Sequence, residues 1–427
     1  MSADGWRRSL VGTAVVLATL LGVFAGLAWW ADGADGDAGP IVPSIPASGP
    51  AVAEAVARGA YLARLGHCAG CHTARGGAPY AGGRALHTSF GTVYAGNLTP
   101  DADTGLGRWT ARDFWRALHH GRSRDGRRLV PAFPYPAFTR IRRADSDALF
   151  AFLRALPAVA QANPPHALRF PYNTQLALGV WRALFFRPGE YVDDAQRPAA
   201  WNRGAYLMQG LGHCAACHAP RNLLGASASS MSGGVLPGGR WWAPPLPDAA
   251  DPADPAAAAR HVVELLRTGR SAFGSASGPM AEVVFGSTQH WRDDDLQAVA
   301  TYLLAPPRPA REAADVAAAA SPALQEQGRS LYDKHCADCH GLRGEGVPGV
   351  YPPLAGNPSV LQPDPRNLVR LLDHGSFAPA TAANPRPYSM PAQALGDAEA
   401  AAVLSYVRQS WGNKASALSE VRVLTLR

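Results

Sequence analysis

The sequence predicts a mainly α-helical protein in which three tandem copies of one small domain follow a single N-terminal transmembrane helix. All six cysteines of the 427-residue chain lie in CxxC pairs, and a histidine follows each pair. A helical pattern precedes each pair, and a second helical pattern closes each segment, which is typical of repeated domains. One uncharged apolar run stands near the N-terminus. With 47% hydrophobic and 17% charged residues, the composition excludes a disordered chain.

The apolar run extends from Leu10 to Trp30 and has the length of a membrane span. As a helix it would rise about 31 Å, enough for the hydrocarbon core of a bilayer. Arginines precede it and aspartates follow it, so the positive-inside rule places the rest of the chain outside the cytoplasm. Residues 1–31 are therefore predicted to be a membrane anchor or a signal segment, and the length favours an anchor. Residues 32–50 form a linker rich in Gly, Pro and Asp.

The three repeats share the pattern of their closing helices. Asp145, Asp295 and Glu399 each precede an aromatic residue by seven positions, so acid and ring share one helix face. A related segment ending in glycine lies before each closing helix, as ALHHG, LLRTG and LLDHG. The predicted organisation is a first domain at 51–160, a connector at 161–200, a second domain at 201–305, a linker at 306–325, a third domain at 326–413 and a tail at 414–427.

Each cysteine pair and its histidine form a CxxCH motif, the attachment signal for c-type haem. Two cysteines three residues apart can reach two vinyl groups on one porphyrin edge, and the adjacent histidine coordinates the iron. A zinc site would need a second ligand pair nearby, and a redox dithiol would need a strand–helix junction. We therefore predict three class-I-like cytochrome c domains. The attachment residues are Cys68, Cys71, Cys214, Cys217, Cys336 and Cys339, and the proximal iron ligands are His72, His218 and His340.

Two of the five methionines occupy matching places in the second and third repeats. Met280 lies 62 residues after His218, and Met390 lies 50 residues after His340. Both stand in loops just before the closing helix. A thioether ligand stabilises ferrous iron and so raises the potential of a haem. We expect Met280 and Met390 to be distal iron ligands.

The first repeat has no methionine between residues 59 and 160. Phe133 occupies the loop where a distal ligand is expected, and a phenyl ring cannot coordinate iron. The first haem therefore has another ligand or an open site, with His87, His119 and His120 as the local candidates. We expect its potential to be lower than that of a haem with histidine and methionine ligands.

A histidine also precedes the first cysteine of each motif, at positions 67, 213 and 335. It is either an exposed structural residue at a helix end or a residue that tunes the haem electrostatically. The sequence favours the structural interpretation.

Positive charge is concentrated in the first repeat. Residues 51–160 hold 15 arginines and 7 acidic residues, a net charge of +8, although the whole chain carries only +7. Ten of these arginines lie between Arg108 and Arg143. They form either a solvated face or a docking patch for an acidic partner or for haem propionates. The bias toward arginine is not interpreted as a nucleic-acid signal.

Residues 55–413 resemble the tri-haem cytochrome c subunits of bacterial membrane-bound dehydrogenases. The resemblance implies three covalently attached haems c. It implies a catalytic dehydrogenase subunit of the molybdenum, quinone or flavin type as partner, and ubiquinone or a terminal oxidase as acceptor. It also implies an inner-membrane location, with the haem domains facing the periplasm. Phe133 departs from the alcohol and gluconate branches and is similar to the molybdenum-partnered branch. The strings that carry the resemblance are AGGRALHTSFGTVYAGNLTPDADTGLGRW (81–109), CHAPRN (217–222), GPMAEVVFGSTQHW (278–291), PPLAGNP (352–358) and SYVRQSWGN (405–413).

The predicted function is electron transfer rather than catalysis, because the sequence has no GxSxG, HExxH or dinucleotide-binding motif. Two alternatives remain open at this point. One is a haem peroxidase that uses an open first haem, with His119 or His120 as its acid–base group. The other is a haem subunit of a terminal oxidase.

Overall fold

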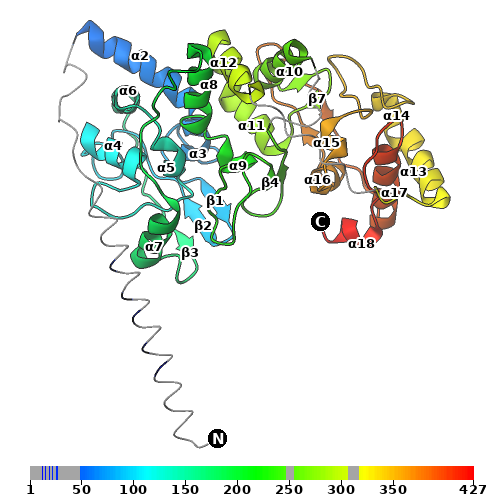
Figure 1. Cartoon of the computed structure of the whole chain (residues 1–427), viewed down its shortest axis with the longest axis horizontal. Coiled ribbons are helices and arrows are strands. Elements are labelled where there is room, and N and C mark those ends of the chain that lie inside the picture. Colours follow the sequence, from blue (N-terminus) through cyan, green and yellow to red (C-terminus); the bar gives the residue numbers. More distant parts are fainter. Residues whose placement is uncertain are drawn as a thin grey trace, which may run out of the picture. The chain divides into compact units, whose positions relative to one another are not determined.

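The computed structural model describes residues 49–246, 254–305 and 317–427, together with the single positions 12, 15, 19, 22 and 26. These residues fold mainly into helices, with short antiparallel sheets between them (Figure 1). The chain divides into two compact units. One comprises Met1–Ala60 with His72–Tyr191, and the other comprises Tyr61–Cys71 with Val192–Arg427.

The predicted N-terminal transmembrane helix requires correction. In the part of the chain that the structure describes, no helix is both long enough and apolar enough to cross a membrane. The longest described helix, α2 (Pro50–Leu65), has 16 residues and includes Glu54 and Arg58, whereas a span needs about 20 consecutive apolar residues. The predicted span at 10–30 lies outside the described residues except for the five single positions. The anchor, the membrane as a partner and the inner-membrane location are therefore not supported.

The first unit combines helices with one three-stranded antiparallel sheet of order β1-β2-β3. Helix α4 (Ala111–His120) begins at a capping box between Thr110 and Asp113 and ends at Gly121, whose left-handed backbone stops the helix. Its buried face includes Phe114 and Leu118. The other elements are α5 (Tyr135–Phe138), α6 (Arg143–Arg154), α7 (Gln175–Phe185), β1 (Ala85–Thr88), β2 (Gly91–Tyr94) and β3 (Ala167–Leu168).

The predicted connector at 161–200 supplies helix α7. The rings of Trp181 and Phe186 pack edge-on against Tyr135, with centroid distances of 6.4 and 4.9 Å. Tyr135 is fully buried. The apolar stretch of the connector therefore contributes to the core of the first unit.

The second unit contains the elements of the second and third repeats, and helix α3 (Cys68–His72) begins within it. Short hairpins separate its helices. The helices are α8 (Ala199–Gln209), α9 (Ala215–His218), α10 (Pro255–Thr268), α11 (Gly278–Gly286), α12 (Asp293–Leu304), α13 (Pro322–His335), α14 (Ala337–His340), α15 (Pro358–Leu361), α16 (Arg366–His374), α17 (Asp397–Gln409) and α18 (Glu420–Leu424), with the 3-10 turn η1 (Thr288–His290). The strands are β4 (Gly234–Val235), β5 (Trp242–Ala243), β6 (Arg270–Ser271), β7 (Gly274–Ser275), β8 (Ser376–Phe377) and β9 (Ser389–Met390).

In every repeat the first helix meets the closing helix at a glycine. The pairs are α2 with α6, α8 with α12, and α13 with α17. At each crossing an added Cβ would collide with a carbonyl of the closing helix and would lie 2.7 Å from the Cβ of its aromatic residue. Only glycine allows the two backbones to approach this closely. Such a Cβ would lie 1.9 Å from the Ala148 carbonyl oxygen at Gly59, 2.0 Å from that of Ala298 at Gly204, and 2.3 Å from that of Ala402 at Gly328.

The acids of the closing helices act in two ways. Asp145 accepts hydrogen bonds from Arg58, and Asp295 accepts hydrogen bonds from Arg203, so each acid ties its closing helix to its first helix. Glu399 instead accepts a hydrogen bond from the backbone N–H of Gly396 and caps α17. The shared spacing of acid and aromatic residue therefore predicts how the helices pack, but not what the acid does. In the first two repeats the acid binds an arginine of the first helix, and in the third it caps its own helix.

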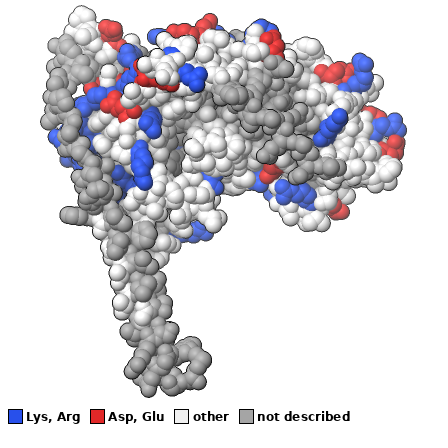
Figure 2. All heavy atoms as spheres, viewed as in Figure 1, with Lys and Arg blue, Asp and Glu red and all other residues white. Residues whose placement is uncertain are grey.

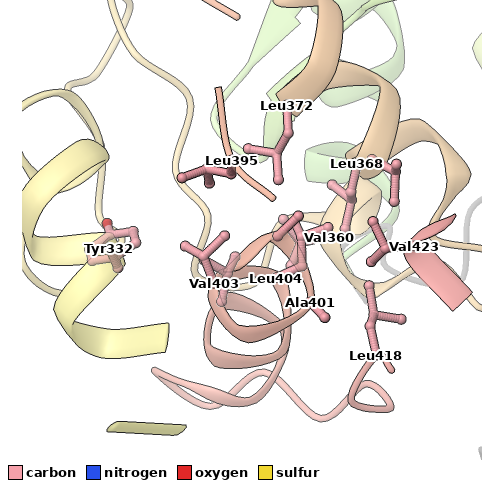
Figure 3. Close-up of a cluster of buried hydrophobic side chains, with 13 residues drawn as sticks. Tyr332, Val360, Leu368, Leu372, Leu395, Ala401, Val403, Leu404, Leu418 and Val423 are labelled. Atoms are coloured by element: carbon pink, nitrogen blue, oxygen red, sulfur yellow. The ribbon is translucent and has the colours of Figure 1, made fainter. Parts of the chain in front are cut away.

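The core of the third repeat lies between α13, α16 and α17, as Figure 3 shows. Tyr332, Val369 and Val403 are among its buried side chains. Residues 414–427, predicted as a tail, include α18 and bury Leu418 and Val423 in this cluster. The last turn of the chain therefore stabilises the third repeat.

Candidate haem sites

The three CxxCH motifs occupy the same place in their repeats. In each repeat the motif contributes the short helix that follows the first helix, as α3, α9 and α14. The first helix ends just before each motif, because the backbone turns there: in the first two repeats the turn passes through a histidine with positive φ. Each motif is thereby separated from the helix that precedes it.

The proximal histidines share one hydrogen bond, from the ring Nδ1 to a backbone carbonyl. Because a carbonyl only accepts, Nδ1 carries the proton, and the lone pair of Nε2 is left for a metal. Burial lowers the pKa of all three imidazoles, which favours the neutral form that a metal binds. The distances are 2.7 Å from His72 to Gly96, 2.8 Å from His218 to Pro244 and 2.9 Å from His340 to Pro352.

The carbonyl partners were not predicted from the sequence. Gly96, Pro244 and Pro352 each stand two positions before a leucine, and the string PPL occurs in the second and third repeats. They follow their histidines by 24, 26 and 12 residues. This variable spacing hides the relationship, although the recurring PPL could have indicated it.

None of the six cysteines forms a disulfide. Burial raises the pKa of Cys68 and Cys214 to about 12 and that of Cys336 to about 11. A structural zinc site would need four ligands, so two cysteines and one histidine would require a further donor. In the described part of the chain no three His, Cys, Asp or Glu side chains gather as a metal site. The donor set therefore fits thioether attachment of a porphyrin better than a zinc centre.

The predicted distal methionines lie at different kinds of element. Met390 is in β9, where it pairs with Ser376 of β8, and its side chain packs on the same hydrophobic cluster as Cys336. Met280 lies in the first turn of α11 and is half-buried. Met208, by contrast, is 2% exposed in α8 and fills the core. The structure thus brings Met390 and the third motif to one cluster.

The candidate ligands of the first repeat occupy three different environments. His87 is exposed on β1, and its Nδ1 lies 3.2 Å from the Thr92 hydroxyl. His119 is buried and stacks on Trp115, with ring centroids 4.4 Å apart. His120 lies at the end of α4, in contact with His119. Phe133 packs against the ring of Phe138.

The arginines of the first repeat largely serve the fold. Arg108, Arg127 and Arg143 pair with aspartates at 2.5, 2.7 and 2.9 Å. Others donate to backbone carbonyls, as Arg128 does to Gln175. Figure 2 shows acidic side chains interspersed with the basic ones on the face in view. This pattern favours a solvated, internally paired face.

The three sites are typical of a c-type cytochrome. The family model for cytochrome c matches residues 325–411. The chain is 38% identical to the cytochrome c subunit of the quinone alcohol dehydrogenase of Gluconobacter oxydans, over 84% of this chain and 79% of that one. It is 34% identical to the cytochrome c subunit of the gluconate 2-dehydrogenase of Pantoea cypripedii, over 85% and 87%.

The chain therefore belongs to the family of cytochrome c subunits of dehydrogenases. Members of this family transfer electrons and are not the catalytic subunits of their complexes. The chain is also 39% identical to a subunit of the nicotinate dehydrogenase of Pseudomonas putida. That match includes 98% of this chain but only 35% of the relative, so the chain spans about a third of that protein's length.

Proposed function

We propose that this chain carries three covalently bound haems c and passes electrons from the catalytic subunit of a dehydrogenase to ubiquinone or a terminal oxidase. The observation that carries the proposal is the threefold recurrence of one donor set. In each repeat a half-buried histidine directs Nδ1 at a backbone carbonyl, beside two cysteines that form no disulfide.

The cysteines would attach each porphyrin, and the Nε2 atoms of His72, His218 and His340 would ligate the iron. When bound, haem supplies reversible one-electron exchange between ferric and ferrous iron. The protein's contribution is to fix the imidazole tautomer by the carbonyl bonds and to surround the group with an apolar core. Met280 and Met390 are the proposed distal ligands of the second and third haems.

The number of haems is tested by expressing the full chain in a host that attaches c-type haem. We expect three haems per chain by pyridine haemochrome assay, with a matching increase in mass. Replacing both cysteines of one motif with alanine should leave two haems, whichever motif is changed. A ratio below three in the unsubstituted chain would contradict the proposal.

The partner is proposed to be a dehydrogenase catalytic subunit of the molybdenum, quinone or flavin type. Phe133, where the alcohol and gluconate branches often have methionine, favours the molybdenum type. Affinity purification of the tagged chain from its native host should recover this subunit, and the dehydrogenase substrate should then reduce the haems. Oxidation of that substrate by the isolated chain would contradict the assignment of an electron-transfer role.

A further inference from the structure

The segment that leads into the first haem motif is fastened to the second repeat. Tyr61 donates a hydrogen bond of 2.6 Å to Asp295, and the guanidinium of Arg292 lies 4.4 Å from the centre of the Tyr61 ring. A few residues later the Ser287 hydroxyl donates to the Leu65 carbonyl at 3.2 Å, with both residues buried. The residues Tyr61–Cys71 accordingly belong to the second unit.

The imidazole of His67 lies between two glycines. A Cβ on Gly70, inside the first CxxC, would lie 1.9 Å from His67 Nε2. A Cβ on Gly286 would lie 2.3 Å from His67 Cε1. Gly286 ends α11, the helix whose first turn contains Met280. The position of Gly70 is taken by Ala216 in the second motif and by Asp338 in the third, so only the first motif leaves this space.

His213 of the second motif completes the contact. Its ring forms a hydrogen bond with the backbone of Gly66, the residue directly before His67. Both histidines have positive φ, 50° for His67 and 37° for His213. This conformation is costly for residues other than glycine and persists where the surrounding structure enforces it. His335, the matching residue of the third repeat, is instead exposed at the end of α13.

We propose that His67 and His213 are positioning residues that join the first and second haem motifs, so that the potentials of those two haems depend on this contact. The hydrogen bond between the His213 ring and the backbone of Gly66 is stronger in this half-buried contact than it would be in water. Replacing either histidine should therefore change the midpoint potentials of both the first and the second haem. The third haem lies outside this contact, so its potential should not change. The inference rests on the proposed function, because it requires haem at both motifs. It also gives His67 and His213 a role in setting haem potentials, beyond the structural role that the sequence favoured.

The test is a spectroelectrochemical titration of the full, haem-loaded chain and its variants. Asparagine tolerates positive φ, so His67→Asn and His213→Asn remove the imidazole with little backbone change. We expect each variant to shift two of the three midpoint potentials, and the double variant to shift them by less than the sum. His335→Asn is the matched control and should shift none. Equal shifts of all three potentials, or no shift in any, would overturn the inference.

Gly286→Ala provides a second variant that keeps both histidines and alters neither motif. Its Cβ displaces the His67 ring, so the same two potentials should shift as in His67→Asn. Unchanged potentials in this variant, with three haems bound, would overturn the inference but leave the proposed function intact. Fewer than three haems in the unsubstituted chain would instead refute the function on which the inference rests.

Discussion

At the scale of single residues, each proposed haem site depends on the donor atom that one side chain presents. The proximal imidazoles are held in one tautomer by carbonyls that follow them at different spacings. A ring held this way needs no reorganisation to ligate a metal, and the same bond raises its basicity toward that metal. The second and third repeats each offer a methionine thioether as the proposed distal ligand, whereas the first repeat has no methionine between residues 59 and 160.

The distal methionines are tested by Met280→Leu and Met390→Leu. Leucine keeps the volume but cannot ligate iron, so the potential of the second or third haem, respectively, should fall. Redox titration resolved by haem measures the change. Met208→Leu, in the core of the second repeat, is the control and should leave all potentials unchanged. A fall in the control alone would contradict the assignment.

Asp295 accepts hydrogen bonds from two side chains, Arg203 and Tyr61, and its replacement should destabilise the second repeat. Burial raises the pKa of Asp295, but hydrogen bonds from Arg203 and Tyr61 outweigh it and hold the pKa below its usual value. We expect Asp295→Asn to lower the free energy of unfolding by about 1–3 kcal/mol near neutral pH, since a buried carboxylate with two donors is lost. Asp293→Asn should cost under about 1 kcal/mol, because its side chain is 84% exposed.

The pH dependence of this difference follows from the depressed pKa. The folded state stabilises the ionised form of Asp295 relative to the unfolded state, so its carboxyl pKa is lower when the chain is folded. The stabilisation is therefore fully present above about pH 4 and disappears as the pH falls through the folded pKa. Urea unfolding of the original chain and of Asp295→Asn should therefore converge at low pH. A difference that grows on acidification would contradict this account.

At the scale of elements, each repeat is organised by one helix crossing. The glycine of the first helix lets its backbone touch the closing helix, and the aromatic residue of the closing helix packs beside it. The turn that follows the first helix then begins the CxxCH motif. The crossing therefore positions the site, because any change in the helix separation moves the motif relative to the core.

Gly328→Ala tests this crossing in the third repeat. The added Cβ would lie 2.3 Å from the Ala402 carbonyl oxygen, so α13 must move away from α17. Although alanine favours helix formation, we expect a net loss of about 1–3 kcal/mol from overpacking. Ser330→Ala, at an exposed position of the same helix, should change stability by less than about 0.5 kcal/mol. Urea unfolding of the two variants checks the difference.

At the scale of the molecule, the second and third repeats are joined within one unit. The side-chain amide of Asn367 in α16 makes two hydrogen bonds to the backbone of Trp242. Its Oδ1 accepts from the Trp242 backbone N–H at 3.0 Å, and its Nδ2 donates to the Trp242 carbonyl at 2.8 Å. Gln289 donates to the Ala380 carbonyl at 3.3 Å. These bonds link segments more than ninety residues apart in sequence. The two repeats should therefore unfold with measurable coupling.

Asn367→Ala should weaken that coupling. It leaves both backbone groups of Trp242 without their partner, at a cost of about 1–3 kcal/mol. We expect the urea unfolding transition of the second unit to broaden or divide in two, while the haem content stays at three. A single transition with unchanged midpoint and slope would contradict the coupling.

The motifs of this protein could be predicted from the sequence because covalent haem attachment requires contiguous residues. CxxCH is such a unit, and the acid–aromatic spacing marks one helix face. The repeats and their proposed proximal ligands can therefore be recognised from the sequence alone. The predicted membrane anchor was not supported, because an apolar run alone does not establish a spanning helix. Only the tertiary structure identified the carbonyls of Gly96, Pro244 and Pro352, the different roles of three similar acids, and the contact of His67 with the second repeat. These contacts depend on segments that packing brings together at variable sequence separations, and the recurring PPL is the one local pattern that points to any of them.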